Sequence, residues 1–192
     1  MRYPAEQTAE RHERIVEAAA RLIRRDGFDG VSVADIMKAA GLTHGGFYAH
    51  FDSKEAMAAA GVERALAGML DLADRAGETD DPQTAFITGY LSARHRDNPD
   101  QGCAMTALGP EIARRNGPVR QAFTTGVRAL IDRLARGVHP AADADPRAEA
   151  ITMISTLLGA LILARAVDDP ALSAEILTTN RAHYGIEPEP AT

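Results

Sequence analysis

The sequence predicts an all-α fold of about nine helices, and three observations support this. Ala, Leu, Arg, Glu and Asp dominate, whereas aromatic residues make up 5% of the 192 positions and tryptophan is absent. No run alternates apolar and polar residues between turn signals, as a half-buried strand would. Asp-Pro dipeptides recur where helices should begin, because Asp is a good N-cap and Pro suits the first helical position. These dipeptides are Asp81-Pro82, Asp145-Pro146 and Asp169-Pro170.

Two helix patterns occupy the first forty residues. Residues 8–25 place apolar side chains on one face, and Gly27 follows as a stop signal. Ser32 begins a second helix that runs to about residue 40. Asp35 lies three positions later, so the pair fits a capping box with Asp in place of Glu.

The stretch GLTHGGFYAHFDSKEAM at 41–57 contains a third, short helix. Thr43 is predicted to cap it, and it ends near Phe51. The turn Gly41-Leu42-Thr43 joins it to the second helix, and two short helices with such a turn match a helix-turn-helix. In this motif the second helix enters the major groove of DNA.

An α-helical wheel of about 100° per residue assigns a role to the glycines of this third helix. Phe47 and Phe51 share the inner side, and a face of very small residues lies opposite. Such a face allows the helix backbone to approach base edges or phosphates closely. Its members are Gly45, Gly46 and Ala49, with His44 and Tyr48 on one flank and His50 on the other.

The remaining helices form a larger bundle. A fourth helix starts at Asp52-Ser53 and ends at about residue 76. The others are expected at 82–96, 102–115 (broken at Pro110), 118–137, 146–167 and 170–183. We therefore expect residues 1–55 to form a DNA-binding domain, residues 56–184 a larger helical bundle, and residues 185–192 a disordered tail.

The charge distribution does not indicate a basic surface for binding a polyanion such as DNA. The net charge is −6, and no Lys or Arg lies between Lys38 and Lys54. DNA contacts would then rely on hydroxyl and imidazole groups, with Lys54 supplying a charge. The single cysteine, Cys103, excludes an intramolecular disulfide and fits the cytoplasm. The apolar segment 151–167 is interrupted by polar residues and is shorter than the roughly 20 residues of a membrane span, so no membrane contact is expected.

The segment RIVEAAARLIRRDGFDGVSVADIMKAAGLTHGGFYAHFDSKEAM at 14–57 resembles the N-terminal DNA-binding domain of the TetR family of transcriptional regulators. The parts GFDGVSVADI, GLT, FYAHF and FDSKEAM carry the resemblance. It implies that Tyr48 and His50 contact phosphates, and that Lys54 anchors the fourth helix on the DNA backbone. It further implies that Thr43, His44 and Gly45 meet phosphates and base edges. The predicted DNA-binding residues are Ser32, Thr43, His44, Gly45, Gly46, Tyr48, His50 and Lys54.

This sequence departs from the family pattern at two positions of the third helix. Position 46 is often threonine or serine in the family, and position 49 often carries a longer side chain, whereas here they are Gly46 and Ala49. We therefore expect fewer direct contacts between side chains and bases than is usual in the family.

The resemblance also implies that residues 56–184 form a ligand-binding and dimerisation domain, with a ligand pocket and a four-helix dimer interface. The helix at 151–167 is apolar nearly all round, which fits burial on more than one side. A central core helix in a monomer is the alternative. The expected pocket residues are Phe86, Tyr90, Cys103, Met105, Phe123, Met153 and Leu157, with Tyr90 orienting the ligand. The expected interface residues are Leu158, Leu161, Ile162, Arg165 and Ile176.

Cys103 allows two interpretations. The segment GCAMTALGPEIA resembles that of a subset of TetR regulators, some of which sense electrophiles or oxidants through a cysteine there. A position at a helix N-terminus favours the reactive thiolate. A lone cysteine is, on the other hand, most often a small buried apolar residue.

The predicted function is a ligand-responsive regulator, in this family most often a repressor, that binds palindromic operator DNA as a homodimer. A small molecule, or a reactive electrophile, would release it. No phosphate-binding loop, dinucleotide fingerprint or metalloprotease motif is present, so no enzymatic activity, cofactor or metal is expected. An all-helical adaptor that binds protein and not DNA is the alternative.

Overall fold

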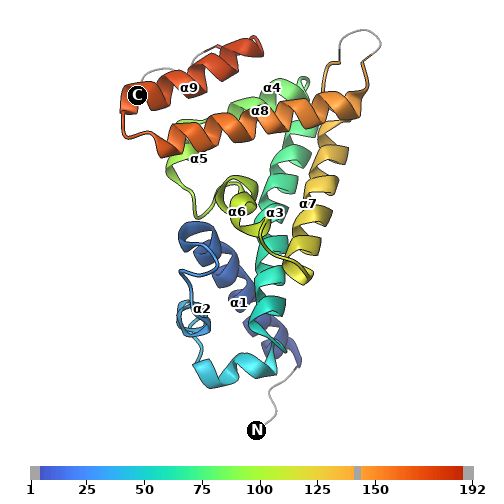
Figure 1. Ribbon diagram of the computed structural model, residues 1–192. Helices are drawn as coiled ribbons and strands as arrows, with labels where there is room; N and C mark the ends of the chain where they lie inside the picture. Colours follow the sequence, from blue (N-terminus) through green and yellow to red (C-terminus); the bar gives the residue numbers. More distant parts are fainter. Residues whose placement is uncertain (1–4, 141–143, 188–192) are drawn as a thin grey trace. The chain divides into compact units, whose positions relative to one another are not determined.

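The computed structural model describes residues 5–140 and 144–187, and every regular element within them is helical. The all-α prediction is therefore confirmed (Figure 1). In chain order the elements are α1 (Ala5–Asp26), α2 (Val33–Ala39), the 3₁₀ helix η1 (His44–Ala49), α3 (Lys54–Gly77), α4 (Pro82–Tyr90), α5 (Ala93–Asp97), α6 (Ala104–Ile112), α7 (Pro118–Leu134), α8 (Pro146–Ala166) and α9 (Pro170–His183).

The three Asp-Pro dipeptides each begin a helix, as predicted. The Asp81 carboxylate accepts the Thr84 N–H at 3.0 Å at the start of α4. Asp145 accepts a backbone N–H at 3.0 Å at the start of α8, and Asp169 does so at 2.8 Å at the start of α9. Each aspartate thus satisfies a backbone donor that has no partner within its helix.

The single helix predicted at 82–96 is wrong, because the chain breaks after Tyr90. Ser92 lies in the break and caps the next helix: its hydroxyl accepts the His95 N–H at 3.1 Å. The same hydroxyl donates to the Gly89 carbonyl at 2.9 Å, which satisfies an acceptor near the end of α4. One serine thereby ends one helix and starts another.

The described chain divides into two compact units that do not follow the order of the sequence. The first contains the residues up to Ala67 together with Cys103–Gly126, and the second contains Gly68–Gly102 together with the chain from Val127 onward. Helix α6 therefore belongs to the same unit as α1, α2 and η1. The functional boundary expected at residue 55 stays a prediction.

The first unit is built on contacts of α1 with α2 and α6, and of α2 with η1. Ile15, Ile36, Met37 and Met57 are completely or almost completely buried in it. Phe47 of η1 joins this core, as the sequence predicted. The packing fixes η1 against α2.

The second unit is built on α8, which packs against α9 and α5. By length and composition alone, α8 could cross a membrane, because Pro146 starts it earlier than the predicted apolar segment 151–167. Part of it is buried within the unit. Of the predicted tail, Gly185–Glu187 is described and Ile186 is buried. Residues 188–192 lie outside the described part.

Candidate nucleic-acid interface and ligand cavity

The N-terminus of α2 is closed by the predicted capping box. The Asp35 N–H donates to the Ser32 hydroxyl at 3.1 Å, and the Ser32 N–H donates to the Asp35 carboxylate at 3.0 Å. The Ser32 hydroxyl also donates to the Asp35 carboxylate. This bond first, and the bond from the Ser32 backbone N–H second, hold the pKa of the Asp35 carboxyl below its usual value. Ser32 is exposed, so it can face a partner, but its hydroxyl is already engaged in the cap.

The turn between α2 and η1 depends on Gly41 and Arg14. Gly41 has a φ of +68°, a left-handed conformation that favours glycine. The Arg14 guanidinium donates to the Ala40 carbonyl at the end of α2. A Cβ atom at position 41 would lie 2.6 Å from that guanidinium. The turn thus needs glycine both for its backbone conformation and for the approach of Arg14.

The third helix is not the α-helix that was predicted. His44–Ala49 forms a 3₁₀ helix, and the Thr43 side chain makes no capping bond to it. A 3₁₀ helix turns about 120° per residue, so the 100° spacing of the predicted wheel does not apply, although Phe47 and Phe51 are buried as it predicted. A Cβ on Gly46 would lie 3.8 Å from the Met37 side chain, whereas one on Gly45 would meet nothing within 4 Å. Gly46 therefore faces the core side, and Gly45 is open.

Tyr48 dominates the exposed side of η1. It is 75% exposed, the largest fraction among the exposed large apolar or aromatic side chains in the described ranges. Residues three apart lie above one another in a 3₁₀ helix, so Tyr48 and Gly45 share a side. The Tyr48 and Phe47 rings pack in an edge-to-face arrangement, with 5.1 Å between their centroids. Thr43 and His44 are exposed beside it.

His50 and Lys54 have contacts within the protein as well. His50 is half-buried, and its ring centroid lies 6.2 Å from that of His12. Burial first, and then the nearby His12 and Arg11, lower the pKa of His50, which favours the neutral imidazole. The Lys54 ammonium donates to the Phe28 carbonyl at 3.4 Å. Their phosphate contacts stay predictions.

Sequence reasoning missed the part of α1 that accompanies η1. Arg11 and His12 both lower the pKa of His50, and the His12 ring stacks on the Phe51 ring with 4.6 Å between centroids. Arg14 donates to the Ala40 carbonyl at the end of α2. Arg11 and Arg14 supply positive charge, whereas the segment 39–53 contains no Lys or Arg. Basic residues on the polar face of the first helix were the available signal.

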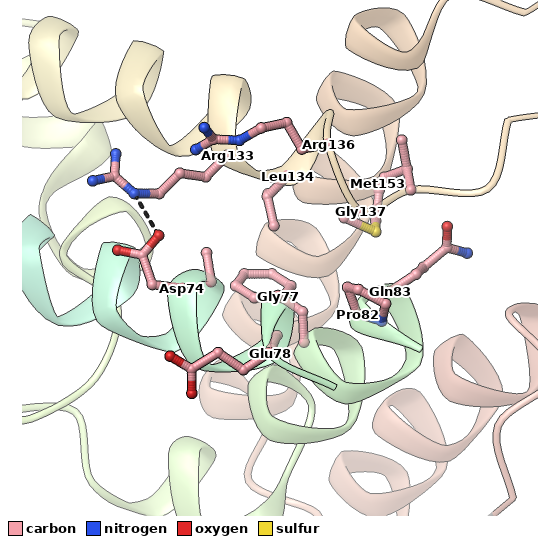
Figure 2. Close-up of a pocket in the computed structure, with 14 residues that line it drawn as sticks. Asp74, Gly77, Glu78, Pro82, Gln83, Arg133, Leu134, Arg136, Gly137 and Met153 are labelled. Carbon is pink, nitrogen blue, oxygen red and sulfur yellow. Dashed lines mark hydrogen bonds and ion pairs between the residues drawn. The ribbon is translucent and has the colours of Figure 1, made fainter. Parts of the chain in front are cut away.

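The second unit contains a cavity of about 390 Å³ formed by α3, α4, α7 and α8 (Figure 2). Phe86 and Met153, both predicted to contact a ligand, line it. Tyr90 and Leu157 are not among its lining residues and are fully buried. The other predicted pocket residues, Cys103, Met105 and Phe123, belong to the first unit. Tyr90 and Leu157 fill the interior of the helix bundle, whereas the cavity lies near the C-terminal ends of α3 and α7.

Family comparisons cover both parts of the chain. A model described as "Bacterial regulatory proteins, tetR family" matches residues 15–60. A second model, "Tetracyclin repressor-like, C-terminal domain", matches residues 82–179. The chain belongs to the TetR family of transcriptional regulators. η1 is accordingly the second helix of the helix-turn-helix of a DNA-binding regulator.

Among curated relatives of this TetR regulator, YvdT of Bacillus subtilis (strain 168), an uncharacterised HTH-type transcriptional regulator, is 42% identical over 65 residues, or 34% of each chain. The HTH-type transcriptional repressor NemR of Escherichia coli (strain K12) is 26% identical over 132 residues, or 66% of each chain. The matches thus span about a third and about two thirds of these relatives. Both relatives are regulators and not enzymes.

Solved structures share the fold over nearly the whole chain. The reduced form of E. coli NemR superposes with a TM-score of 0.76 at 25% identity, covering 95% of this chain and 99% of that one. A TetR regulator from Chloroflexus aurantiacus gives a TM-score of 0.73 at 26% identity, covering 95% and 98%.

The expected dimer residues of this TetR regulator differ in exposure. Ile162 is exposed, and Leu158 and Ile176 are partly exposed, whereas Leu161 is fully buried. Arg165 donates to the backbone carbonyls of His95 and Arg96, so it holds α5 within its own unit. The large exposed apolar residues of α8 and α9 are Ile151, Ile162, Leu163 and Leu172.

Proposed function

We propose that this TetR regulator is a repressor that binds a palindromic operator as a homodimer and leaves it when a ligand binds. The observation that carries this is Tyr48, exposed beside the open Gly45 on a helix held by α2. The relative NemR is a transcriptional repressor, which favours repression. Residues 1–55 would read DNA, and residues 56–184 would bind ligand and dimerise.

The open side of η1 would lie in the major groove. Gly45 lets the backbone approach, and Thr43 and His44 reach base edges from exposed positions. The Tyr48 hydroxyl would donate to a phosphate, and Lys54 would add a charge beside it. With so few side chains on this surface, DNA shape would carry part of the specificity.

Homodimerisation would bury the exposed apolar residues of α8 and α9. Leu163 is 56% exposed, and Ile151, Ile162 and Leu172 are each slightly above 40%. Burial of apolar surface is favourable by about 25 cal/mol per Å², so association with a second copy that exposes the same residues would stabilise the dimer. The two η1 helices would then enter successive major grooves, with half-site centres about 34 to 36 Å apart.

A ligand in the cavity of the second unit would release the operator by favouring a different spacing of the two DNA-binding domains. The cavity has the size of a small-molecule site. Release by an electrophile is the other expected route. Cys103 precedes α6 with 0% exposure, so such a reagent would need a local opening to reach the thiol.

No cofactor, metal or catalytic activity enters this proposal, and we place the protein in the cytoplasm without membrane contact. The proposed partners are double-stranded operator DNA, a small-molecule inducer and a second copy of the chain. An adaptor that does not bind DNA is the competing function, and the exposed Tyr48 beside Gly45 argues against it.

The test is selection of bound fragments from genomic DNA, followed by affinity measurements on the selected operator and on unrelated DNA. Tyr48→Phe and Lys54→Ala should weaken binding to both DNAs, because phosphate contacts do not read sequence. Tyr184→Phe, in the second unit, is the control and should bind normally. Enrichment of no fragment would favour the adaptor, and a monomer at micromolar concentration would contradict the dimer.

A further inference from the structure

The cavity of the second unit has an apolar wall. Phe86 and Met153 are each 1% exposed, and Leu134 at the end of α7 is also buried. These side chains come from α4, α8 and α7, so the wall is assembled from three helices. It suits the apolar body of a compact ligand.

The side of the cavity where α7 ends carries arginine side chains. Arg133 and Arg136 both line the cavity, and in Figure 2 the Arg136 side chain extends along α7 toward Arg133. Arg133 donates to the Asp74 carboxylate at 2.9 Å, which neutralises that pair. No carboxylate partner of Arg136 is found within the described ranges of the chain. One arginine of the two is therefore available to a ligand.

The other polar groups do not offset this positive charge. Glu78 also lines the cavity, but Figure 2 shows its carboxylate directed away from the two arginines. The side-chain carbonyl of Gln83 accepts the His139 N–H at 2.7 Å. The amide NH₂ group of Gln83 thus remains as a donor. The Arg136 guanidinium and, elsewhere in the lining, the Gln83 amide are therefore donors left for a ligand.

We propose that this cavity binds a small organic acid. Its carboxylate pairs with the Arg136 guanidinium, and its apolar body lies on Phe86, Leu134 and Met153. The fork of N–H groups on arginine matches a carboxylate, and such charge-assisted bonds are strong. This inference rests on the proposed function for the consequence of binding, namely release of DNA, but not for the binding itself.

The charges on the arginine side of the cavity also disfavour cationic and neutral ligands. A cationic ligand would face the uncompensated charge of Arg136, while the Asp74 carboxylate is already paired and the Glu78 carboxylate points away from the arginines. A neutral analogue of the same shape would lose the charge-assisted bond and leave the guanidinium partly desolvated. The acid should therefore bind more tightly than its amide.

Calorimetric titration of the full-length protein tests this with benzoate, 3-phenylpropionate and hexanoate as probes. The matched controls are benzamide, 3-phenylpropionamide and hexanamide, which differ only in the head group. At least one acid should bind about tenfold more tightly than its amide, as expected for one charge-assisted bond. Equal affinity of each acid and its amide, or no binding of any acid at millimolar concentration, would overturn the proposal.

Variants identify the arginine. Arg136→Gln should abolish the preference for the acid, whereas Arg128→Gln, an exposed arginine on the same helix that does not line the cavity, should leave it unchanged. Asp74→Asn should increase acid affinity, because it frees Arg133. An acid preference that survives in Arg136→Gln would place the anion elsewhere and contradict the assignment.

Operator binding measured in parallel separates this inference from the proposed function. An acid that binds through Arg136 but does not release the operator would support the site and contradict ligand release. Release of the operator by an amide as readily as by its acid would support ligand release and overturn the organic-acid assignment.

Discussion

The carboxylate of Glu111 on α6 accepts the backbone N–H of Phe28, 83 positions earlier, at 3.0 Å. Arg115 reinforces this contact: its guanidinium lies 4.3 Å from the Phe28 ring centroid and 3.2 Å from the Asp29 carboxylate. Gly27, next to this contact, has a φ of +76°. Helix α6 is thereby fastened to the turn between α1 and α2, within the first unit.

Glu111→Ala should destabilise this unit, because the Phe28 N–H loses its acceptor. The expected loss in the free energy of unfolding is about 1 to 2 kcal/mol. Glu111→Gln keeps a carbonyl acceptor and should lose less. Urea unfolding measures the change, with Glu63→Ala as a control on an exposed glutamate of α3. Equal stability of the Glu111 and Glu63 variants would mean that the bond contributes nothing.

Gly45→Leu should lower DNA affinity at least about tenfold while the fold stays intact. A Cβ atom at this position meets no protein atom within 4 Å, so the added side chain begins in open space and should obstruct only a partner at the surface of η1. Gly68→Leu on α3, where an added Cβ atom also meets nothing within 4 Å, is the matched control and should bind DNA normally. Fluorescence anisotropy on a selected operator measures both. Undiminished affinity of Gly45→Leu would remove this side of η1 from the interface.

Ser32→Ala should cost about 1 kcal/mol of stability, the usual value of an N-cap. It should also make the free energy of unfolding depend less on pH in the acidic range. The pKa of Asp35 is lowered chiefly by the Ser32 hydroxyl, so its contribution is present above the unfolded value, near 3.8, and is lost as pH falls through the lower folded pKa. Ser53→Ala, which removes the cap of Ala56 on α3, is the comparison. An unchanged acid slope in Ser32→Ala would contradict this cause.

The stability of the wild type should decrease as pH falls below about 6.5, partly through His95. Burial lowers the pKa of His95; the bond to the Tyr90 carbonyl at 2.7 Å opposes this effect, and Arg165 adds to it. The folded protein thus favours the neutral ring, and its contribution is complete above the unfolded pKa and is lost as pH falls toward the folded value. His95→Gln should have a shallower slope in urea unfolding across this range. An identical slope would assign the effect to other groups.

The sequence revealed the features that depend on neighbouring residues. Asp81 and Ser32 begin helices where predicted, since a cap needs only residues two or three positions away. The 3₁₀ form of residues 44–49 was not predictable, because six residues are too few to distinguish periods of 3.0 and 3.6. The partners of Arg14 and Glu111 lie 26 and 83 positions away, and only the folded chain brings them together.

The discontinuous first unit has a consequence for protein engineering. Exchanging DNA-binding domains between regulators by a cut at residue 55 would separate Phe28 from Glu111 and leave each without its partner. A transplant that carries the chain to Ala67 together with Cys103–Gly126 keeps both residues in one piece. The natural module for grafting a new operator specificity is therefore made of two segments of the chain.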